Sequence, residues 1–349
     1  MIPETKKDIR SMLPEEISEE LISAGFPAFR AKQVFGWLSK GVTSFDQMTN
    51  IPKDLREYLL QKYYIFGADI ENRQISEYDS TVKYLFRLFD GRFVESVLMK
   101  YKYGYSICIS TQVGCRMNCA FCATGKGGFE RNLYPSEMLA QIMTAQADRN
   151  IRISHVVLMG MGEPLDNYDN VLRFLKLAAL EQGLNLSMRH ISLSTCGLVG
   201  RMEQLMQEKL QLTLSVSLHA PTDEIRDKIM PVNKSYNVDT LLECCKKYTQ
   251  ATSRRISFEY IMINGVNDSP QCAEILASKL KGMLCHVNLI PANEVKESGF
   301  VKSNRDTTVK FADILSGKGI NVTIRRTLGS DIDASCGQLR SRAKSEGGK

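Results

Sequence analysis

The sequence predicts an α/β protein whose main part is a partial (β/α)6 barrel, preceded by an N-terminal helical accessory domain and a β-hairpin extension. Six short apolar runs alternate with segments of helical periodicity between residues 105 and 290. Alternation of this kind is typical of a parallel sheet with helices outside it. Before the barrel, the first 70 residues contain only helical segments, and an Asp-Gly pair at residues 90–91 joins two strand-like segments.

The accessory domain is expected at residues 1–70. Gly and Pro residues separate its three helices, which are expected at 15–24, 29–38 and 53–63. A linker and the hairpin occupy residues 71–104, with hairpin strands at 84–89 and 93–99. The barrel and a C-terminal loop take residues 105–338, and residues 339–349 form a flexible tail.

The six barrel strands are expected at 105–111, 154–159, 190–194, 212–218, 256–263 and 285–290. Because connections between parallel strands are right-handed, six such strands can curl into a partial barrel. The segment 320–325 is expected to add an edge strand.

Composition fits a globular enzyme of the cytoplasm. Hydrophobic residues make up 43% of the 349 residues and charged residues 24%, which is ordinary for a globular chain. No long apolar stretch predicts a membrane span, and no signal peptide is recognisable, so the 10 cysteines are expected in a reducing compartment. The net charge of +6 is compatible with an RNA partner but does not establish one.

Cys115, Cys119 and Cys122 form a C-x3-C-x2-C triplet directly after the first barrel strand. Three thiolates on a [4Fe-4S] cluster leave one iron open to bind a small molecule, and S-adenosylmethionine is the obvious candidate. The alternatives are a zinc knuckle or ordinary core cysteines. Zinc prefers a fourth Cys or His nearby, and none lies within twenty residues downstream of Cys122.

The other unusual segments also follow barrel strands, where the loops of parallel barrels build active sites. These segments are GMGEP at 160–164, STCG at 194–197, SLH at 217–219 and PAN at 291–293. Glu163 would suit the amino group of a methionine moiety, although a tight turn explains GMGEP equally well. Ser194, Ser217 and Asn293 suit ribose or carboxylate groups, but each alone is more often a cap or turn residue. His219 would either contact a ligand or hold a loop.

Over essentially its full length the chain resembles the radical S-adenosylmethionine RNA methyltransferases. The resemblance lies in VESV (94–97), CISTQVGC (108–115), GMGEP (160–164), SLHA (217–220), HVNLIPAN (286–293) and DIDASCGQL (331–339). It implies a radical SAM barrel with Cys115, Cys119 and Cys122 as cluster ligands. The implied S-adenosylmethionine contacts are Gly162, Glu163, Ser194, Ser217, Leu218, His219 and Asn293.

The resemblance also implies a mechanism and substrates. Cys336 would carry a methyl group taken from a first S-adenosylmethionine, and a second would generate the radical that joins this carbon to the base. Glu95 would remove the C2 proton from the covalent protein–RNA adduct, and Cys108 would release the product through a transient disulfide. The implied substrates are adenine 2503 of 23S rRNA and adenine 37 of tRNAs, both methylated at C2.

A flavodoxin- or ferredoxin-type electron donor, a monomeric state and an RNA-binding role for residues 1–70 are further implications. Two alternatives stay open: methylation at C8 of the same rRNA adenine, as in a related branch of the family, and a non-catalytic iron–sulfur RNA-binding or electron-transfer protein. Pro164 and Pro291 favour the C2 reaction, whereas Glu294 and the short tail depart from the family pattern. The remaining cysteines are expected to be structural: Cys196, Cys244, Cys245, Cys272 and Cys285.

Overall fold

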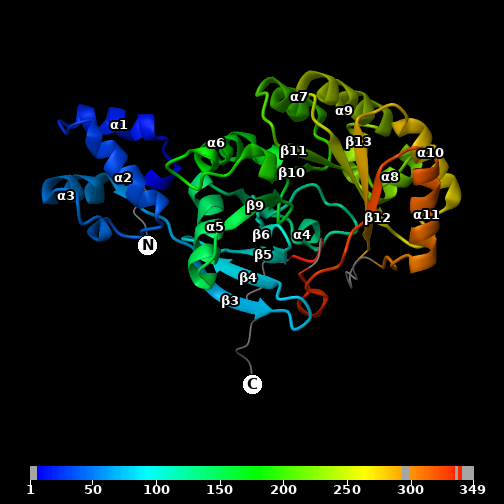
Figure 1. Cartoon of the computed structure of the whole chain (residues 1–349), viewed down its shortest axis with the longest axis horizontal. Helices are drawn as coiled ribbons and strands as arrows, with labels where there is room; N and C mark the ends of the chain where they lie inside the picture. The colour runs from blue at the N-terminus through cyan, green and yellow to red at the C-terminus, as the bar shows by residue number, and fades with distance from the viewer. Residues whose placement is uncertain (1–5, 293–298, 335–336, 340–349) are drawn as a thin grey trace.

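The structure is a computed structural model that describes residues 6–292, 299–334 and 337–339. Its centre is a ten-stranded sheet with the strand order β14-β13-β12-β11-β10-β9-β6-β5-β4-β3 (Figure 1). The strands from β14 to β6 are parallel to their neighbours. The strands β5, β4 and β3 are antiparallel. The predicted α/β class with a parallel sheet is therefore confirmed.

All six expected barrel strands and the edge strand are present. They are β6 (Gly104–Cys108), β9 (Ile153–Leu158), β10 (Ile191–Thr195), β11 (Thr213–Ser217), β12 (Ile256–Met262), β13 (Cys285–Pro291) and β14 (Val322–Ile324). The strand β6 ends three residues earlier than expected, because the Ser110 amide leaves the ladder and donates to Oε1 of Gln141 at 2.8 Å. The chain then forms a small separate hairpin from β7 (Gln112–Gly114) and β8 (Phe129–Asn132).

The expected hairpin is formed by β4 (Val82–Arg87) and β5 (Phe93–Tyr101). It extends the barrel sheet, since β5 also pairs with β6 and sets Val97 opposite Cys108. The strand β3 (Asp69–Ile75) was not predicted. Every residue of β3 is exposed, and its sequence lacks the apolar alternation by which a half-buried strand is recognised. It forms a strand because it pairs with β4.

Helices cover the outer side of the parallel strands, as the alternating pattern predicted (Figure 1). These are α5 (Pro135–Arg149), α6 (Tyr168–Ala179), α7 (Val199–Gln207), α9 (Val238–Thr252), α10 (Pro270–Leu280) and α11 (Arg305–Gly317). Two shorter helices, α4 (Ala123–Lys126) and α8 (Asp223–Ile229), belong to the segments that follow β7 and β11. Single 3-10 turns occupy Ile9–Ser11, Phe45–Gln47, Pro164–Asn167, Met188–His190, Pro231–Lys234 and Ser330–Ile332.

The N-terminal part contains α1 (Pro14–Ser23), α2 (Phe29–Ser39) and α3 (Lys53–Lys62), and its short strands β1 (Lys7–Asp8) and β2 (Tyr63–Tyr64) pair in parallel. It lies at the opposite end of the molecule from α10 and α11 (Figure 1). Arg173 of α6 and Glu16 of α1 form an ion pair of 2.6 Å, and the Ser136 amide donates to Oγ of Ser11 at 3.1 Å. These contacts join the N-terminal helices to the barrel.

Within the described ranges, none of the helices combines the length and the apolar character needed to cross a bilayer.

Candidate active site

A large cavity opens at the carboxyl ends of the barrel strands. It encloses about 960 Å³ of empty space, the open mouth included. Most of the residues singled out in the sequence line it: Cys115, Cys119, Cys122, Gly162, Glu163, Ser194, Ser217 and His219. Leu218 is fully buried behind this wall, and Asn293 lies outside the described residues. The fold thus brings together segments that are far apart in the sequence, as the barrel rule predicts.

The three clustered cysteines lie on the loop that connects β7 to α4. Burial raises the pKa of the Cys115 thiol to about 12, and burial followed by the neighbouring Cys122 and Cys115 raises the pKa of Cys119. Three mutually close thiols of this kind are costly to ionise unless a metal centre binds them.

The described residues contain no group of three His, Cys, Asp or Glu side chains close enough to hold a single metal ion. A four-iron cluster binds each thiolate through a different iron, so its ligands do not need to converge on one point. The cavity beside the three thiols provides the open side that a substrate-binding cluster requires. The donor set therefore fits a cluster with three protein ligands.

The GMGEP loop after β9 needs both of its glycines. A Cβ atom on Gly160 would lie 2.6 Å from the Ile109 carbonyl oxygen. Gly162 has φ of +104°, and a Cβ there would lie 2.6 Å from Cβ of Gln112. Both positions exclude side chains, so the loop backbone itself forms part of the cavity wall.

Glu163 connects this loop to the end of β10. Its Oε2 accepts a hydrogen bond from the Cys196 amide at 2.7 Å, and its Oε1 accepts one from the Leu165 amide at 3.0 Å. Burial raises the pKa of Glu163, and the two amide donors counteract this. The carboxylate is therefore a turn-forming group that also lies at the cavity wall, and its contact with a methionine amino group stays a prediction.

His219 follows β11 in the left-handed region, with φ of +58°. Its Nδ1 accepts a hydrogen bond from the Ile261 amide at 3.0 Å, and its ring packs edge-on against Phe121 with 4.8 Å between centroids. Burial, with a contribution from Arg226, lowers the pKa of His219 to about 3. The imidazole is thus neutral with its proton on Nε2, and it holds the β11 and β12 ends together while lining the cavity.

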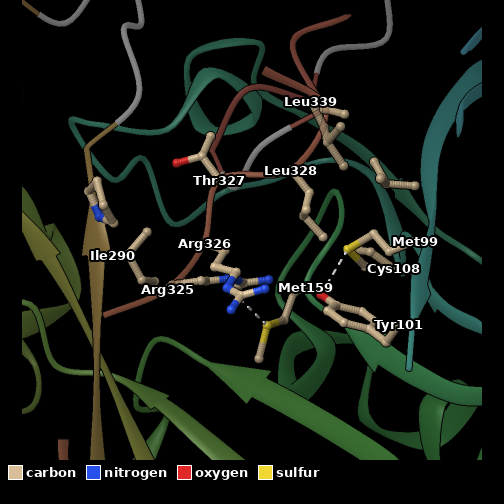
Figure 2. Close-up of a pocket in the computed structure, with 13 residues that line it drawn as sticks. Met99, Tyr101, Cys108, Met159, Ile290, Arg325, Arg326, Thr327, Leu328 and Leu339 are labelled. Atoms are coloured by element: carbon tan, nitrogen blue, oxygen red, sulfur yellow. Dashed lines mark hydrogen bonds between the residues drawn. The ribbon is translucent and has the colours of Figure 1, made fainter. Parts of the chain in front are cut away.

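A second cavity of about 560 Å³ adjoins the first, and Met159, Ile290, Arg325 and Leu339 line both. Figure 2 shows this second cavity, with the guanidinium groups of Arg325 and Arg326 between Ile290 and Cys108. Cys108 is 7% exposed on the wall that β5 and β6 form.

Cys336 lies outside the described residues, but its flanking residues border the site. Ala334 lines the second cavity, and Gly337 lines the first. The Gly337 carbonyl accepts a hydrogen bond from the Ala123 amide at 2.8 Å, which anchors this segment to the cysteine loop.

Glu95 is buried on β5, two residues before Val97 on the same face, but it is not among the residues that line either cavity. The expected general base therefore lies beside the second cavity rather than in its wall.

Among the residues that line the first cavity, sequence reasoning did not single out Glu259, and it took Cys196 as structural. Glu259 had a detectable signal, because it is the one charge in the apolar strand ISFEYIM. Arg325 had its closeness in sequence to Cys336 as a signal, and Cys196 had its place in the STCG segment at 194–197.

Comparison with known proteins agrees with this geometry. Residues 109–272 match the family model described as Radical SAM superfamily, and residues 7–65 match the one described as Ribosomal RNA large subunit methyltransferase N-terminal domain. A probable dual-specificity RNA methyltransferase RlmN from Thermoanaerobacter sp. is 50% identical, covering 95% of this chain and 97% of its own length. One from Desulforamulus reducens is 49% identical, covering 98% of each chain.

Among solved structures, a radical SAM methyltransferase from Sphaerobacter thermophilus matches with a TM-score of 0.92 and 39% identity. The match covers 96% of this chain and 100% of that one. The fold and the arrangement of the N-terminal part are thus shared along nearly the whole chain.

Proposed function

Because the chain belongs to the RlmN family of dual-specificity RNA methyltransferases within the radical SAM superfamily, we propose that it methylates C2 of adenine 2503 in 23S rRNA and C2 of adenine 37 in tRNAs. Membership of this family makes the chain a radical S-adenosylmethionine RNA methyltransferase, so the non-catalytic alternative is wrong.

One observation carries the proposal: two cavities adjoin, and the residues around Cys336 line both. The first cavity has the three proposed cluster cysteines on its wall, together with the proposed S-adenosylmethionine contacts Gly162, Glu163, Ser194, Ser217 and His219. The second has Cys108. The described residues on either side of position 336 therefore border both the cavity assigned to the methyl donor and the cavity that has room for a base beside Cys108.

When bound, the cluster and S-adenosylmethionine supply a transferable methyl group and the one-electron chemistry that activates an unreactive carbon. We assign the cluster to Cys115, Cys119 and Cys122. The cofactor contacts are assigned to the residues around Glu163, Ser194, Ser217 and His219, with Gly162, Leu218 and Asn293. Two molecules of S-adenosylmethionine are used per methylated base in this proposal.

The chain's own groups carry the remaining chemistry. Cys336 accepts the methyl group as a thiolate, and Arg325 and Arg326, which line the adjoining cavity, favour the thiolate form. After the methyl carbon has joined C2, Glu95 takes the C2 proton. Proton loss at C2 requires that the adduct radical has given up one electron, for which the bound cluster would be the acceptor. The Cys108 thiolate then attacks the Cys336 sulfur, which forms a disulfide and breaks the bond between that sulfur and the transferred carbon. The carbon keeps the bonding electron pair and takes a proton from the surroundings to become the methyl group. An external thiol reductant resets the disulfide.

The electron donor of flavodoxin or ferredoxin type, the monomeric state and the cytoplasmic location stay predictions from the sequence. The RNA-binding role of residues 1–70 is a proposal too. It is supported by the family model that matches residues 7–65.

The test is anaerobic turnover with S-adenosylmethionine, a reductant, and 23S rRNA or tRNA supplied separately. Nucleoside mass spectrometry then compares the product with 2-methyladenosine and 8-methyladenosine standards. We expect 2-methyladenosine on both RNAs and none with Cys336→Ala. A product of 8-methyladenosine would assign the chain to the C8 reaction, and no product from protein with a full cluster would contradict the proposal.

A further inference from the structure

Arg226 of α8 is the largest fully buried side chain in the described part of the structure, with 0% of its surface exposed. Its guanidinium group has five N–H donors, and five hydrogen bonds use them. Nε donates to the Leu218 carbonyl at 3.1 Å, and Nη1 to Oδ1 of Asn233 at 3.0 Å and the Tyr236 carbonyl at 3.3 Å. Nη2 donates to the carbonyls of Cys196 at 2.7 Å and Ser217 at 3.2 Å.

These acceptors belong to the two strand ends that form the proposed cofactor site. The Cys196 carbonyl follows β10, directly after Ser194 and Thr195. The Ser217 and Leu218 carbonyls end β11. A planar guanidinium with fixed donor directions sets the spacing of the two strand ends, which a flexible lysine amine would not do.

The buried charge of Arg226 has no direct carboxylate partner among the ion pairs of the described residues. Asp223, on the same helix, instead accepts hydrogen bonds from Asn233 at 3.1 Å and from the Val238 amide at 2.7 Å. A buried cation without a counter-ion is costly, so an anionic group near it would repay part of that cost.

The end of α8 lies against the cysteine loop. The Ala120 amide, directly after Cys119, donates to the Ile229 carbonyl at 2.9 Å, and Cys119 packs against the buried cluster that contains Cys196 and Ile229. Cys119 is one of the three proposed cluster ligands. A cluster bound by three thiolates carries net negative charge, and this charge increases by one on reduction.

We propose that Arg226 is a positioning residue that fixes the β10 and β11 ends around S-adenosylmethionine and stabilises the reduced cluster by its buried positive charge. The inference rests on the proposed assignment of the cluster to Cys115, Cys119 and Cys122. It goes beyond that assignment because it gives a role to a residue that contacts neither a substrate nor an iron atom. Arg226 acts through its hydrogen bonds to backbone carbonyls and through the electric field of its positive charge.

The test compares Arg226→Gln, Arg226→Lys and the control Lys228→Gln, which removes an exposed charge from the same helix. Three quantities are measured without RNA: iron content, the midpoint potential of the cluster by EPR-monitored titration, and equilibrium binding of S-adenosylmethionine. We expect Arg226→Gln to have a more negative potential and about 10-fold weaker binding or worse. Arg226→Lys should keep a potential near the wild-type value but bind S-adenosylmethionine more weakly, and Lys228→Gln should match the wild type.

Wild-type potential and affinity in a fully loaded Arg226→Gln protein would overturn the inference. If Arg226→Gln cannot be loaded with iron, the test depends on Arg226→Lys. Wild-type affinity of that variant for S-adenosylmethionine would then contradict the inference. None of these measurements uses RNA. The results would therefore be the same if the proposed RNA substrates were wrong. Absence of a cluster in the wild-type protein would instead contradict the proposed function.

Discussion

The Lys83 amine lies 3.8 Å from Oε1 of Glu95, and both side chains are largely buried. The two residues stand on neighbouring strands of the sheet extension, where Lys83 pairs with Val97 and Leu85 with Glu95. Lys83 Nζ also donates to the Asp333 carbonyl at 3.4 Å, close to the segment that carries Cys336. One lysine thus links the proposed general base to the proposed methyl-carrying segment.

Glu95→Gln is expected to lower the rate of RNA methylation by about 10² to 10⁴-fold, the range over which a general base contributes. The isosteric amide keeps the packing but cannot take the C2 proton. Single-turnover methylation with loaded protein measures the effect, and Asp69→Asn, at an exposed ion pair between β3 and β4, is the control. Full activity in Glu95→Gln would remove Glu95 from the mechanism.

Cys119→Ser is expected to lose most of the iron and all reductive cleavage of S-adenosylmethionine, since two thiolates do not hold the cluster. Iron and sulfide analysis measures this. Cys244→Ser is the control, because Cys244 is a buried cysteine on α9, outside both cavities. Equal iron content in the two variants would contradict the ligand assignment.

Cys108→Ala is expected to accumulate a covalent protein–RNA species, because no thiolate remains to attack the Cys336 sulfur. Denaturing gel electrophoresis after anaerobic turnover would show a slower band that nuclease removes. Cys285→Ala, a buried cysteine on β13, should release product normally. Normal release by Cys108→Ala would mean that another group performs this step.

Gly162→Ala is expected to lower the free energy of unfolding by about 1–3 kcal/mol and to weaken S-adenosylmethionine binding. The cause is the φ of +104° together with the contact of an added Cβ with Gln112. Denaturant unfolding and ligand binding measure the two effects. Gly200→Ala on α7 meets no atom within 4 Å and should change stability by less than about 1 kcal/mol.

His219 is expected to make stability depend on pH below neutrality. Its folded pKa of about 3 lies below the unfolded value of 6.5, so the unfolded state binds the proton first as the pH falls. The stabilising effect of the neutral imidazole is complete above pH 6.5 and is lost progressively toward pH 3.

The difference between wild type and His219→Asn isolates this effect, because Glu163 and Glu259, whose pKa values are raised, titrate in both proteins. The asparagine can still accept from the Ile261 amide but does not titrate. Urea unfolding from about pH 7 to about pH 4 should show a shallower loss in His219→Asn. An identical loss in both proteins would show that His219 is not the responsible group, and His190→Asn, at an exposed histidine, serves as the control.

Much of the fold was determined locally in the sequence. The barrel strands are short apolar runs, which form strands where they are buried, so each end of β9 to β13 was predicted to within one residue. The sequence also predicted the roles of the cysteine triplet and the GMGEP loop, because ligand spacing and glycine conformation depend on neighbouring residues in the chain. Their common position at one cavity followed from the rule for parallel barrels.

Only the tertiary structure decided which of the remaining charges matter. β3 is a strand because β4 lies beside it, not because of its own residues. Arg226 resembles any helix arginine in the sequence, yet folding buries it against carbonyls from two strands. Arg325 likewise lines both cavities only because the C-terminal segment folds back against the barrel. Local patterns determine elements and metal spacing, whereas burial and long-range proximity depend on how distant segments pack together.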